Sequence, residues 1–277
     1  MSIPIANHAS MLPSPELTAA IERSEIDYML DRMTAIQERP GNPEGIEIRR
    51  FGGAVAFSSR TMPWPSFNTV KGLTDANLDD LDAILEFYRL QGRKAQLEIV
   101  PSRVGPDFLR RLNELGLYQS GFHCSLIGEP RPPVSDRAGQ TIAIREIGAD
   151  EFELYATLHC RGTGLPDEGI PHVRRNNEVL HGRAGWTFFA AESNGVPAAA
   201  AVMYERGGIA SLTFAATLPE FRRQGLQRAL IQHRAAEASA RGSKAIVGQC
   251  AYLSQSHRNM ESVGMKLGYI RTAWTQL

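Results

Sequence analysis

Hydrophobic residues along this chain recur with two different spacings, and the two kinds of stretch alternate from one end to the other. Short runs rich in β-branched and aromatic residues predict strands, while apolar residues spaced three and four apart predict helices. Strands are expected at 46–51, 54–59, 69–73, 95–100, 118–126, 141–147, 186–191, 196–204, 209–217, 245–250 and 267–274. Helices are expected at 15–38, 78–90 after a cap at Asn77, 106–115, from Asp150 to about 160, 173–180, 226–241 and 256–263. This alternation predicts an α/β fold with a central mixed β-sheet flanked by helices.

The pattern also repeats itself. A helix, a strand, a second helix, a glycine and a final strand occur once in each half of the chain. Lys94 and Lys244 are 150 residues apart at one equivalent position, and Gly116 and Gly264 are 148 apart at another. The proline-rich, polar stretch between the halves is typical of a linker. We therefore predict domains at 1–128 and 140–277, joined by a linker at 129–139, with an unrelated α/β domain as the alternative for the first half.

One stretch carries candidate chemistry. The predicted strand 209–217, with Leu212, Phe214 and Ala216 on one face, should end before Pro219, because proline cannot donate to a sheet ladder. A basic, glycine-containing turn then leads into the next helix, whose apolar residues are Leu226, Ala229, Leu230, His233 and Ala236. The first amides of a helix have no intrahelical partner and form an anion site. The sequence therefore predicts a phosphate-binding turn, with an ordinary solvated turn as the alternative.

The turn resembles a motif of the GNAT superfamily of acyl-CoA N-acyltransferases, Arg/Gln-x-x-Gly-x-Gly/Ala. Arg222, Gln224, Gly225 and Leu226 fit the motif, whereas Gln227 stands where glycine or alanine is usual. The resemblance covers roughly residue 141 to the C-terminus. It implies acetyl-CoA as co-substrate, with its pyrophosphate on the turn and its pantetheine arm along the end of the strand. The implied cofactor-binding residues are Ala215, Ala216, Thr217, Arg222, Arg223, Gln224, Gly225, Leu226, Gln227, Arg228 and Asn259.

The first half has 69–75 where the second half has this turn, so it resembles a degenerate GNAT-like copy without the phosphate site. The resemblance therefore implies two GNAT-like domains in tandem.

The implied reaction is direct attack of a primary amine on the thioester of acetyl-CoA, with transfer of the acetyl group. Many family members protonate the departing thiolate with a tyrosine four residues before the glycine that closes the penultimate helix. Met260 or Gly264 occupies that position here, depending on whether Gly264 or Gly268 closes the helix. Tyr269 and Ser256 are the remaining catalytic candidates, and each has a structural role as its alternative, as Asn259 does. Without a clear acid, a sensor that binds CoA without turnover is the alternative function.

Composition excludes some partners. The chain has 277 residues with 30 basic and 30 acidic side chains, so no overall charge favours nucleic acid or an anionic membrane. Three scattered cysteines and a start without a signal-peptide pattern favour a cytoplasmic protein with reduced thiols. The spacing of histidines and cysteines matches no metal site, and a nucleotide-binding Gly-Lys-Ser/Thr is not found. The acceptor is expected to be a small-molecule or peptide amine, whose identity the sequence leaves open, as it does the oligomeric state.

Overall fold

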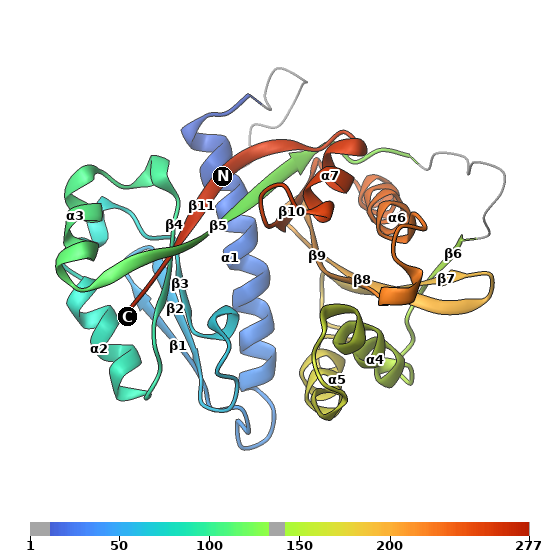
Figure 1. Ribbon diagram of the computed structural model, residues 1–277, viewed down its shortest axis with the longest axis horizontal. Coiled ribbons are helices and arrows are strands. Elements are labelled where there is room, and N and C mark those ends of the chain that lie inside the picture. Colours follow the sequence, from blue (N-terminus) through green and yellow to red (C-terminus); the bar gives the residue numbers. More distant parts are fainter. Residues whose placement is uncertain (1–11, 133–141, 277) are drawn as a thin grey trace. The chain divides into compact units, whose positions relative to one another are not determined.

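The structure is a computed structural model that describes residues 12–132 and 142–276. Its contacts divide the chain into two compact units. The first unit contains Leu12–Ser125 together with 267–276, and the second contains Leu126–Lys266. Each unit has a mixed sheet flanked by helices, which confirms the predicted α/β class (Figure 1). No helix in the described ranges is long and apolar enough to cross a membrane.

The first unit begins with the long helix α1. Pro15 occupies the first turn, where its missing N–H costs nothing, and the Ser14 hydroxyl accepts the Leu17 N–H at 3.1 Å. The first unit contains α1 (Pro15–Gln37), β1 (Ile46–Phe51), β2 (Ala54–Ser59), β3 (Thr69–Lys71), α2 (Leu81–Leu90), β4 (Gln96–Ile99), α3 (Pro106–Glu114), most of β5 (Leu117–Gly128) and most of β11 (Lys266–Gln276), with short 3₁₀ helices at Pro65–Phe67, Asp75–Asn77 and Pro101–Arg103.

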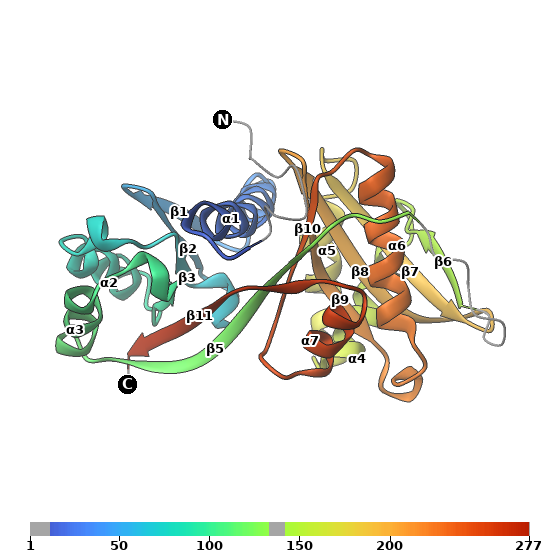
Figure 2. The ribbon, with the colours of Figure 1, turned by 90° about the horizontal axis from the view of Figure 1, so that it is seen from above.

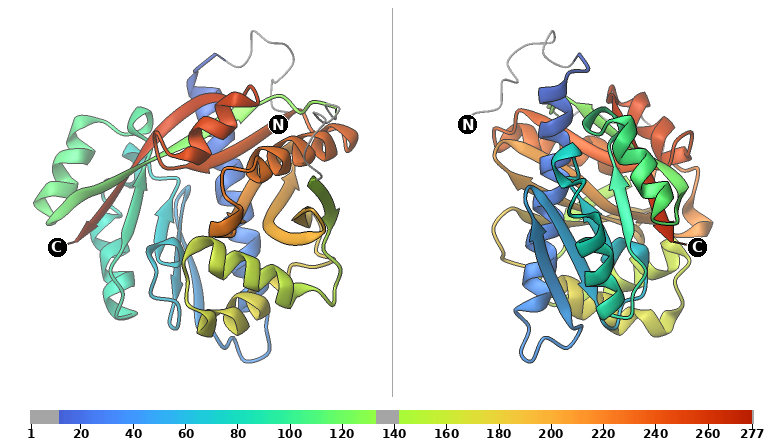
Figure 3. Two further views of the ribbon diagram at one scale, coloured as in Figure 1. Left: turned by 45° about the vertical axis from the view of Figure 1, so that its right-hand side comes forward. Right: turned by 90° about the vertical axis from the view of Figure 1, so that its left-hand side faces the viewer.

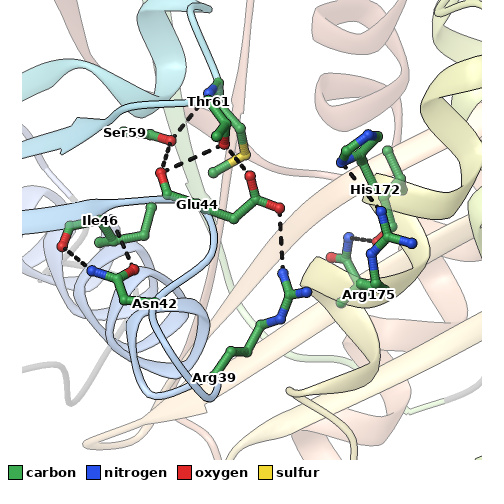
Figure 4. A network of polar contacts seen from close by, with 11 residues as sticks. Arg39, Asn42, Glu44, Ile46, Ser59, Thr61, His172 and Arg175 are labelled. Carbon is green, nitrogen blue, oxygen red and sulfur yellow. Dashed lines mark hydrogen bonds and ion pairs between the residues drawn. The ribbon is translucent and has the colours of Figure 1, made fainter.

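Polar side chains fix the turn that joins α1 to β1 (Figure 4). The buried Glu44 accepts from Arg39 at 3.3 Å and from the Thr61 hydroxyl through its carboxylate, while its carbonyl oxygen accepts from Ser59 at 3.0 Å. Asn42 exchanges two hydrogen bonds with the backbone of Ile46. The chain therefore leaves the helix and enters the sheet in a defined direction.

Helices α2 and α3 share one apolar core with one face of the first unit's sheet. Phe87 and Tyr88 of α2 and Phe108 of α3 pack with residues of β2, β3 and β4 such as Val70 and Leu97. Helix α1 lies on the opposite face, against β1 (Figure 2). The strand order is β1-β2-β3-β4-β11-β5, so the strand that comes last in the chain lies inside the first unit's sheet (Figure 3).

The second unit is built around β9. It contains β6 (Ile142–Glu146), α4 (Phe152–Thr163), α5 (Ile170–Glu178), β7 (Trp186–Ser193), β8 (Val196–Arg206), β9 (Ile209–Thr217), α6 (Leu226–Ala240), β10 (Ala245–Cys250) and α7 (Gln255–Ser262), with 3₁₀ helices at Asp167–Gly169 and Pro219–Phe221. Strands β6 to β9 are antiparallel neighbours, whereas β10 runs parallel to β9. Helix α6 lies on one face of this sheet, and α4 and α5 lie on the other (Figure 1).

The two units repeat one topology, as predicted. In the first, β2 pairs antiparallel with β3, and α2 then leads to β4, which is parallel to β3. In the second, β8 pairs antiparallel with β9, and α6 leads to β10, which is parallel to β9. Because strand directions and order match, the likeness of the two halves is one of fold and not only of glycine and lysine spacing.

The final strands of the two copies are exchanged between the units. β11 follows the second copy in sequence but pairs antiparallel with β4, with Thr272 opposite Ile99 and Trp274 opposite Leu97. Conversely, the last residues of β5 belong to the second unit, where a Cβ on Gly128 would lie 2.9 Å from Met265 Cγ. The predicted linker at 129–139 lies largely outside the described residues, so the predicted division there stays a prediction.

Two of the predicted helix caps, Asn77 and Asp150, are wrong. α2 begins at Leu81, because Asn77 accepts the Thr74 N–H at 3.1 Å and donates to the Phe51 carbonyl at 2.9 Å, which holds a turn before the helix. α4 begins at Phe152, and its cap position is Glu151 rather than Asp150. The Glu151 carboxylate accepts the Gly148 N–H at 2.9 Å instead of an amide of the helix.

Buried charges occupy the interior of the first unit. Glu25 of α1 accepts from Arg271 and from the hydroxyls of Ser125 and Tyr269, and Arg271 Nε lies 3.0 Å from Glu98, which also pairs with Lys71. Burial alone would raise the pKa of Glu98. The two cations outweigh burial and lower the pKa from 4.5 to about 2.

The charge of Glu98 should make stability depend on pH. Because its folded pKa is depressed, its contribution is fully present above pH 4.5 and is lost as the pH falls toward 2. We expect Glu98→Gln to lower the free energy of unfolding by roughly 3 kcal/mol at pH 7 and by progressively less below pH 4.5. Urea unfolding at several pH values measures this. Glu86→Gln, which removes an exposed carboxylate, is the control, and a difference independent of pH from 7 to 3 would contradict the assignment.

The strand exchange predicts how the chain responds to cutting. A fragment of residues 140–277 retains the groups of β11 that pair with β4 but loses β4, and it also loses the end of β5. We expect it to be insoluble or unfolded, because unpaired strand edges and newly exposed apolar surface favour aggregation. Circular dichroism and size-exclusion chromatography of the fragment check this. A folded monomer with native helix content would show that the exchanged strands are dispensable.

Candidate active site

Strands β9 and β10 part before either strand ends. Their parallel ladder runs from the Ile209–Ala245 pair to the Leu212–Gly248 pair. Beyond it, β9 continues to Thr217 and β10 continues to Cys250. The backbone groups of β9 after Leu212 that would have continued this ladder are therefore available to a ligand on the β10 side.

A β-bulge lies where the strands part. On the other side of β9, Ala216 is opposite Ala200 but Thr213 is opposite Val202, so β9 has one residue more than β8 over this interval. Phe214 has φ +48°, in the left-handed region that is uncommon for an aromatic residue. The predicted alternation of Leu212, Phe214 and Ala216 on one face is therefore wrong beyond Thr213, because the extra residue shifts the register.

The turn after β9 presents a row of backbone amides. Arg223 has φ +61° and Gly225 has φ +87°, and α6 starts directly afterwards. No side chain caps this helix, and the first hydrogen bond of the helix is donated by Ala229. The amides from Arg223 to Arg228 have no acceptor within residues 12–132 and 142–276. Together with the positive end of the helix dipole, they form an anion site.

A groove of about 1000 Å³ connects the turn with the open end of β9. It gathers nearly all the predicted cofactor-binding residues on one surface. The residues that line it are Gly162, Ala215, Ala216, Thr217, Pro219, Glu220, Phe221, Arg222, Arg223, Gly225, Leu226, Gln227, Arg228, Gln255, Ser256 and Asn259. Gln224 is not part of the lining. Its amide oxygen accepts from Ser193 at 3.2 Å, and its nitrogen donates to the Glu220 carbonyl at 3.3 Å. These two hydrogen bonds stabilise the turn.

Helix α4 forms one wall of the groove. A Cβ on Gly162 would lie 2.9 Å from the Cβ of Ala216, so glycine allows the helix to approach the strand closely. Arg222 donates to the Gly162 carbonyl at 3.0 Å and fixes this approach. Arg223 and Arg228 are exposed and form no ion pair with the described residues, so their charges can act on an anion at the turn.

The unusual Gln227 joins two helices. Its amide nitrogen donates to Ser256 Oγ at 2.6 Å, and its oxygen accepts from Asn259 Nδ2 at 2.5 Å. Gln255 in turn donates to the Asn259 oxygen at 2.9 Å. The longer side chain is therefore accommodated by pairing with α7, and it lines the groove.

A small cavity of about 90 Å³ adjoins the groove at the bulge. Its lining includes Phe214, Gln249, Met260 and Arg234 besides the shared Gln227 and Ser256. Gly264 has φ +91° directly after α7, so it closes this helix and Met260 occupies the position where the family resemblance implies tyrosine. A thioether cannot donate a proton, so acid catalysis at this position is not available.

Several of these residues were missed at the sequence level. Gln249 is polar in an otherwise apolar strand, which is a weak signal. Arg234 follows Leu226 and Leu230 at helical spacing and lies on the buried face of α6 with them. The predicted apolar set with His233 and Ala236 was thus displaced around the helix, since Leu226, Leu230, Ile231, Arg234, Ala235 and Ala238 are the buried residues. The role of Gly162 could not be recognised from the sequence, because its close approach to β9 is a tertiary contact between distant parts of the chain.

The two catalytic candidates occupy different places. Ser256 lines both the groove and the cavity, and its oxygen accepts from Gln227, which leaves its own hydrogen free to donate. Tyr269 belongs to the first unit, is buried, and donates to Glu25 at 2.9 Å. Burial raises the pKa of its hydroxyl well above 10, so this proton is held in the ion cluster.

In the first copy the equivalent region is filled by the protein's own groups. Lys71 and Glu98, next in register after the Val70–Leu97 pair, form an ion pair where β9 and β10 part in the second copy. In the turn after β3, Asn77 accepts the Thr74 N–H. Asp75 accepts the Gly105 N–H at 2.7 Å. In the first copy an ion pair and side-chain acceptors thus occupy the region that is open in the second copy.

Comparison with known proteins agrees with this geometry. Residues 150–264 match the model of the acetyltransferase (GNAT) family, which confirms the predicted resemblance over this part of the chain. No curated protein matches the chain.

Solved structures extend the likeness of fold to both units. A GCN5-related N-acetyltransferase from Kribbella flavida is 16% identical over 88% of this chain and 95% of that chain, with a TM-score of 0.61. A tandem GNAT protein from the clavulanic acid biosynthesis pathway is 15% identical over 89% of this chain and 92% of that chain, with a TM-score of 0.60. A conserved protein of unknown function from Staphylococcus epidermidis is 12% identical over 82% and 92%, with a TM-score of 0.61. The fold is therefore a tandem GNAT fold.

The anion site can be tested by Gly225→Glu. The new carboxylate would stand among the open amides and repel phosphate, so we expect CoA binding by calorimetry to weaken at least a hundredfold while the circular dichroism spectrum is unchanged. Gly207→Glu is the matched control, because Gly207 also has a left-handed φ of +61° and open space around it but lies in the β8–β9 turn. Undiminished binding, or two equivalent CoA sites per chain, would contradict this site.

Proposed function

We propose that the second unit binds acetyl-CoA and transfers its acetyl group to the primary amine of a small molecule or peptide. The observation that carries this proposal is the continuous path from the uncapped start of α6 to the parting of β9 and β10. It offers donors for a pyrophosphate at one end and an unpaired strand edge at the other. The GNAT family match of residues 150–264 supports the same activity.

The groove residues suggest how the co-substrate is held. The amides of Arg223 to Arg228 would receive the pyrophosphate, helped by the exposed arginines. The pantetheine amides would pair with the free edge of β9 near Ala215 and Thr217, as an added strand pairs with a sheet edge. Asn259 and Gln227 face the same groove from α7 and α6. In this proposed arrangement the thioester would lie near the cavity at the bulge.

Acetyl transfer then has three chemical requirements that the protein can assist. The amine must arrive neutral and lose a proton, the thioester oxygen must carry developing negative charge, and the sulfur must leave as a thiolate that is finally protonated. No aspartate, glutamate or histidine is among the described residues that line the cavity, so a water molecule is the proposed proton carrier. Ser256 is the one side-chain hydroxyl shared by groove and cavity, and it would assist this path.

A CoA-binding sensor is the second candidate. Met260 in place of tyrosine favours it, because the protein then lacks a direct acid for the thiolate. The two functions differ in one measurement. The enzyme consumes acetyl-CoA in the presence of a suitable amine, whereas the sensor binds CoA with the thioester intact. We propose that the first copy is structural in either case, because its equivalent of the binding turn is filled by Asn77 and Asp75.

Turnover is tested by following release of the CoA thiol with acetyl-CoA and a panel of amines, including diamines, aminoglycosides and peptides. We expect Ser256→Ala and Tyr269→Phe each to slow turnover by roughly tenfold or less, since general acid catalysis contributes about 10²–10⁴-fold where one residue supplies it. Tyr269→Phe should mainly lower stability, through its lost bond to Glu25. A thousandfold loss of turnover with CoA affinity intact would identify the altered residue as the acid. No thiol release with any amine, while CoA binds, would favour the sensor.

A further inference from the structure

One buried cation lies beside the cavity at the bulge. The side chain of Arg234, on the inner face of α6, is 1% exposed. Its Nε donates to the Leu230 carbonyl at 3.0 Å, and its Nη1 donates to the carbonyls of Val202 at 2.8 Å and Thr213 at 3.3 Å. All three acceptors are neutral, and no carboxylate pairs with this guanidinium within residues 12–132 and 142–276.

Such a charge is expensive to bury. Removing a cation from water without an opposite charge is unfavourable, and burial lowers the pKa of Arg234 to about 9. The group nevertheless remains protonated at neutral pH. An apolar side chain would fill the inner face of α6 at lower cost, so the presence of arginine calls for a use of its charge or of its hydrogen bonds.

The hydrogen bonds have a local explanation. Val202 and Thr213 are opposite each other on β8 and β9, at the last regular pair before the extra residue of β9. The guanidinium thus binds both carbonyl groups of the strand pair next to the bulge, beside the left-handed Phe214. These bonds account for the position of the side chain, but they do not require a full positive charge, because an amide group could donate in the same way.

The charge faces the cavity. Arg234 is the one charged side chain that lines it among the described residues, and the other lining residues from β9, α6, β10 and α7 are neutral. The cavity shares Ala215, Gln227 and Ser256 with the groove. A space of about 90 Å³ holds only a few water molecules, so the field of the cation is screened less there than in bulk water.

The length of the cofactor's arm matches the distance from the turn to Arg234. Arg234 is nine positions beyond Gly225, which corresponds to about 14 Å along the helix. The pantetheine arm joins the pyrophosphate to the sulfur through about twelve bonds, and twelve chain bonds also advance about 14 Å when extended. A cofactor whose phosphates lie at the start of α6 and whose arm follows β9 would therefore bring its sulfur level with Arg234.

We propose that Arg234 is the electrostatic positioning residue of the acyl-transfer site, where its buried charge stabilises the negative charge that develops on the thioester oxygen and on the departing sulfur. This inference rests on the proposed CoA site. In the reaction the amine nitrogen forms a bond to the acetyl carbon, the carbon–sulfur bond breaks, and the electron pair of that bond stays on the sulfur. Arg234 transfers no proton. It makes the thiolate a better leaving group and so replaces part of what a proton donor would supply at Met260.

The test measures the ionisation of bound CoA itself. Thiolate absorbance near 240 nm is followed against pH for the full chain saturated with CoA, and the same titration with desulfo-CoA is subtracted to remove protein cysteines and tyrosines. A free thiol of this kind ionises near pH 8.5, and we expect bound CoA to ionise at least about one pH unit lower. An unchanged or higher value in the wild-type complex would overturn the proposal without any variant.

Variants separate charge from shape. Arg234→Gln keeps one donor for the bulge and loses the charge, so the bound thiol should ionise about one pH unit higher than in the wild type, a tenfold change in its ionisation constant. Arg234→Lys keeps the charge and should restore the low value. Arg241→Met removes a cation from the far end of α6 and should change nothing. Equal titrations for the glutamine and lysine variants would mean that Arg234 is only structural.

Failure of the proposed function would look different. If the wild-type protein bound neither CoA nor desulfo-CoA in calorimetry, the groove itself would be wrongly assigned. If CoA and desulfo-CoA bound equally well but the thiol ionised as in water, the groove would be confirmed as the CoA site and the proposed role of Arg234 would be wrong.

Discussion

Backbone hydrogen bonding is the constraint on which the second unit depends. A buried peptide group needs a partner, and β9 has partners on both sides only as far as Leu212. From there the protein satisfies one side of the strand through β8 and leaves the other side to whatever occupies the groove. Three features surround this opening. They are the bulge at Phe214, the close approach of Gly162 to β9, and the hydrogen bonds of Gln227 to α7. The site is thus an interruption of the sheet at a defined place, held by contacts of the neighbouring helices and strands.

The first copy shows what the same topology becomes when the interruption is closed. Lys71 and Glu98 tie the two parallel strands together, and further buried charges from α1 and β11 complete the cluster. Burying charged side chains costs desolvation free energy, so each buried charge needs an oppositely charged partner. Here the pairing is nearly complete, which is why Glu98 stays ionised far below its ordinary range. One fold therefore supplies an open groove in one unit and a sealed polar interior in the other.

The sequence was informative where structure is local. The strands at 209–217 and 245–250 have their predicted bounds because glycines and a proline mark their ends, and the amide turn was predictable because Gly225 stands between a strand and a helix. The bulge could not be predicted, since a left-handed Phe214 runs against the preference of that residue. Tyr269 was nominated because it is close to the motif in sequence, yet pairing with β4 carries its strand into the other unit. Such long-range pairing leaves no periodic signal. The cofactor roles of the groove residues stay a prediction.

The exchanged strands also have a consequence for the growing polypeptide. Multidomain chains commonly fold from the N-terminus as each domain leaves the ribosome. The first unit is incomplete at that stage, because Ile99 of β4 pairs with Thr272, which is 173 residues further along the chain. During that interval the edge of β4 and the core beneath it remain uncovered. The first half must therefore remain incompletely folded until nearly all of the second half has been synthesised. During this period its exposed strand edge and apolar surface make it a suitable substrate for chaperones.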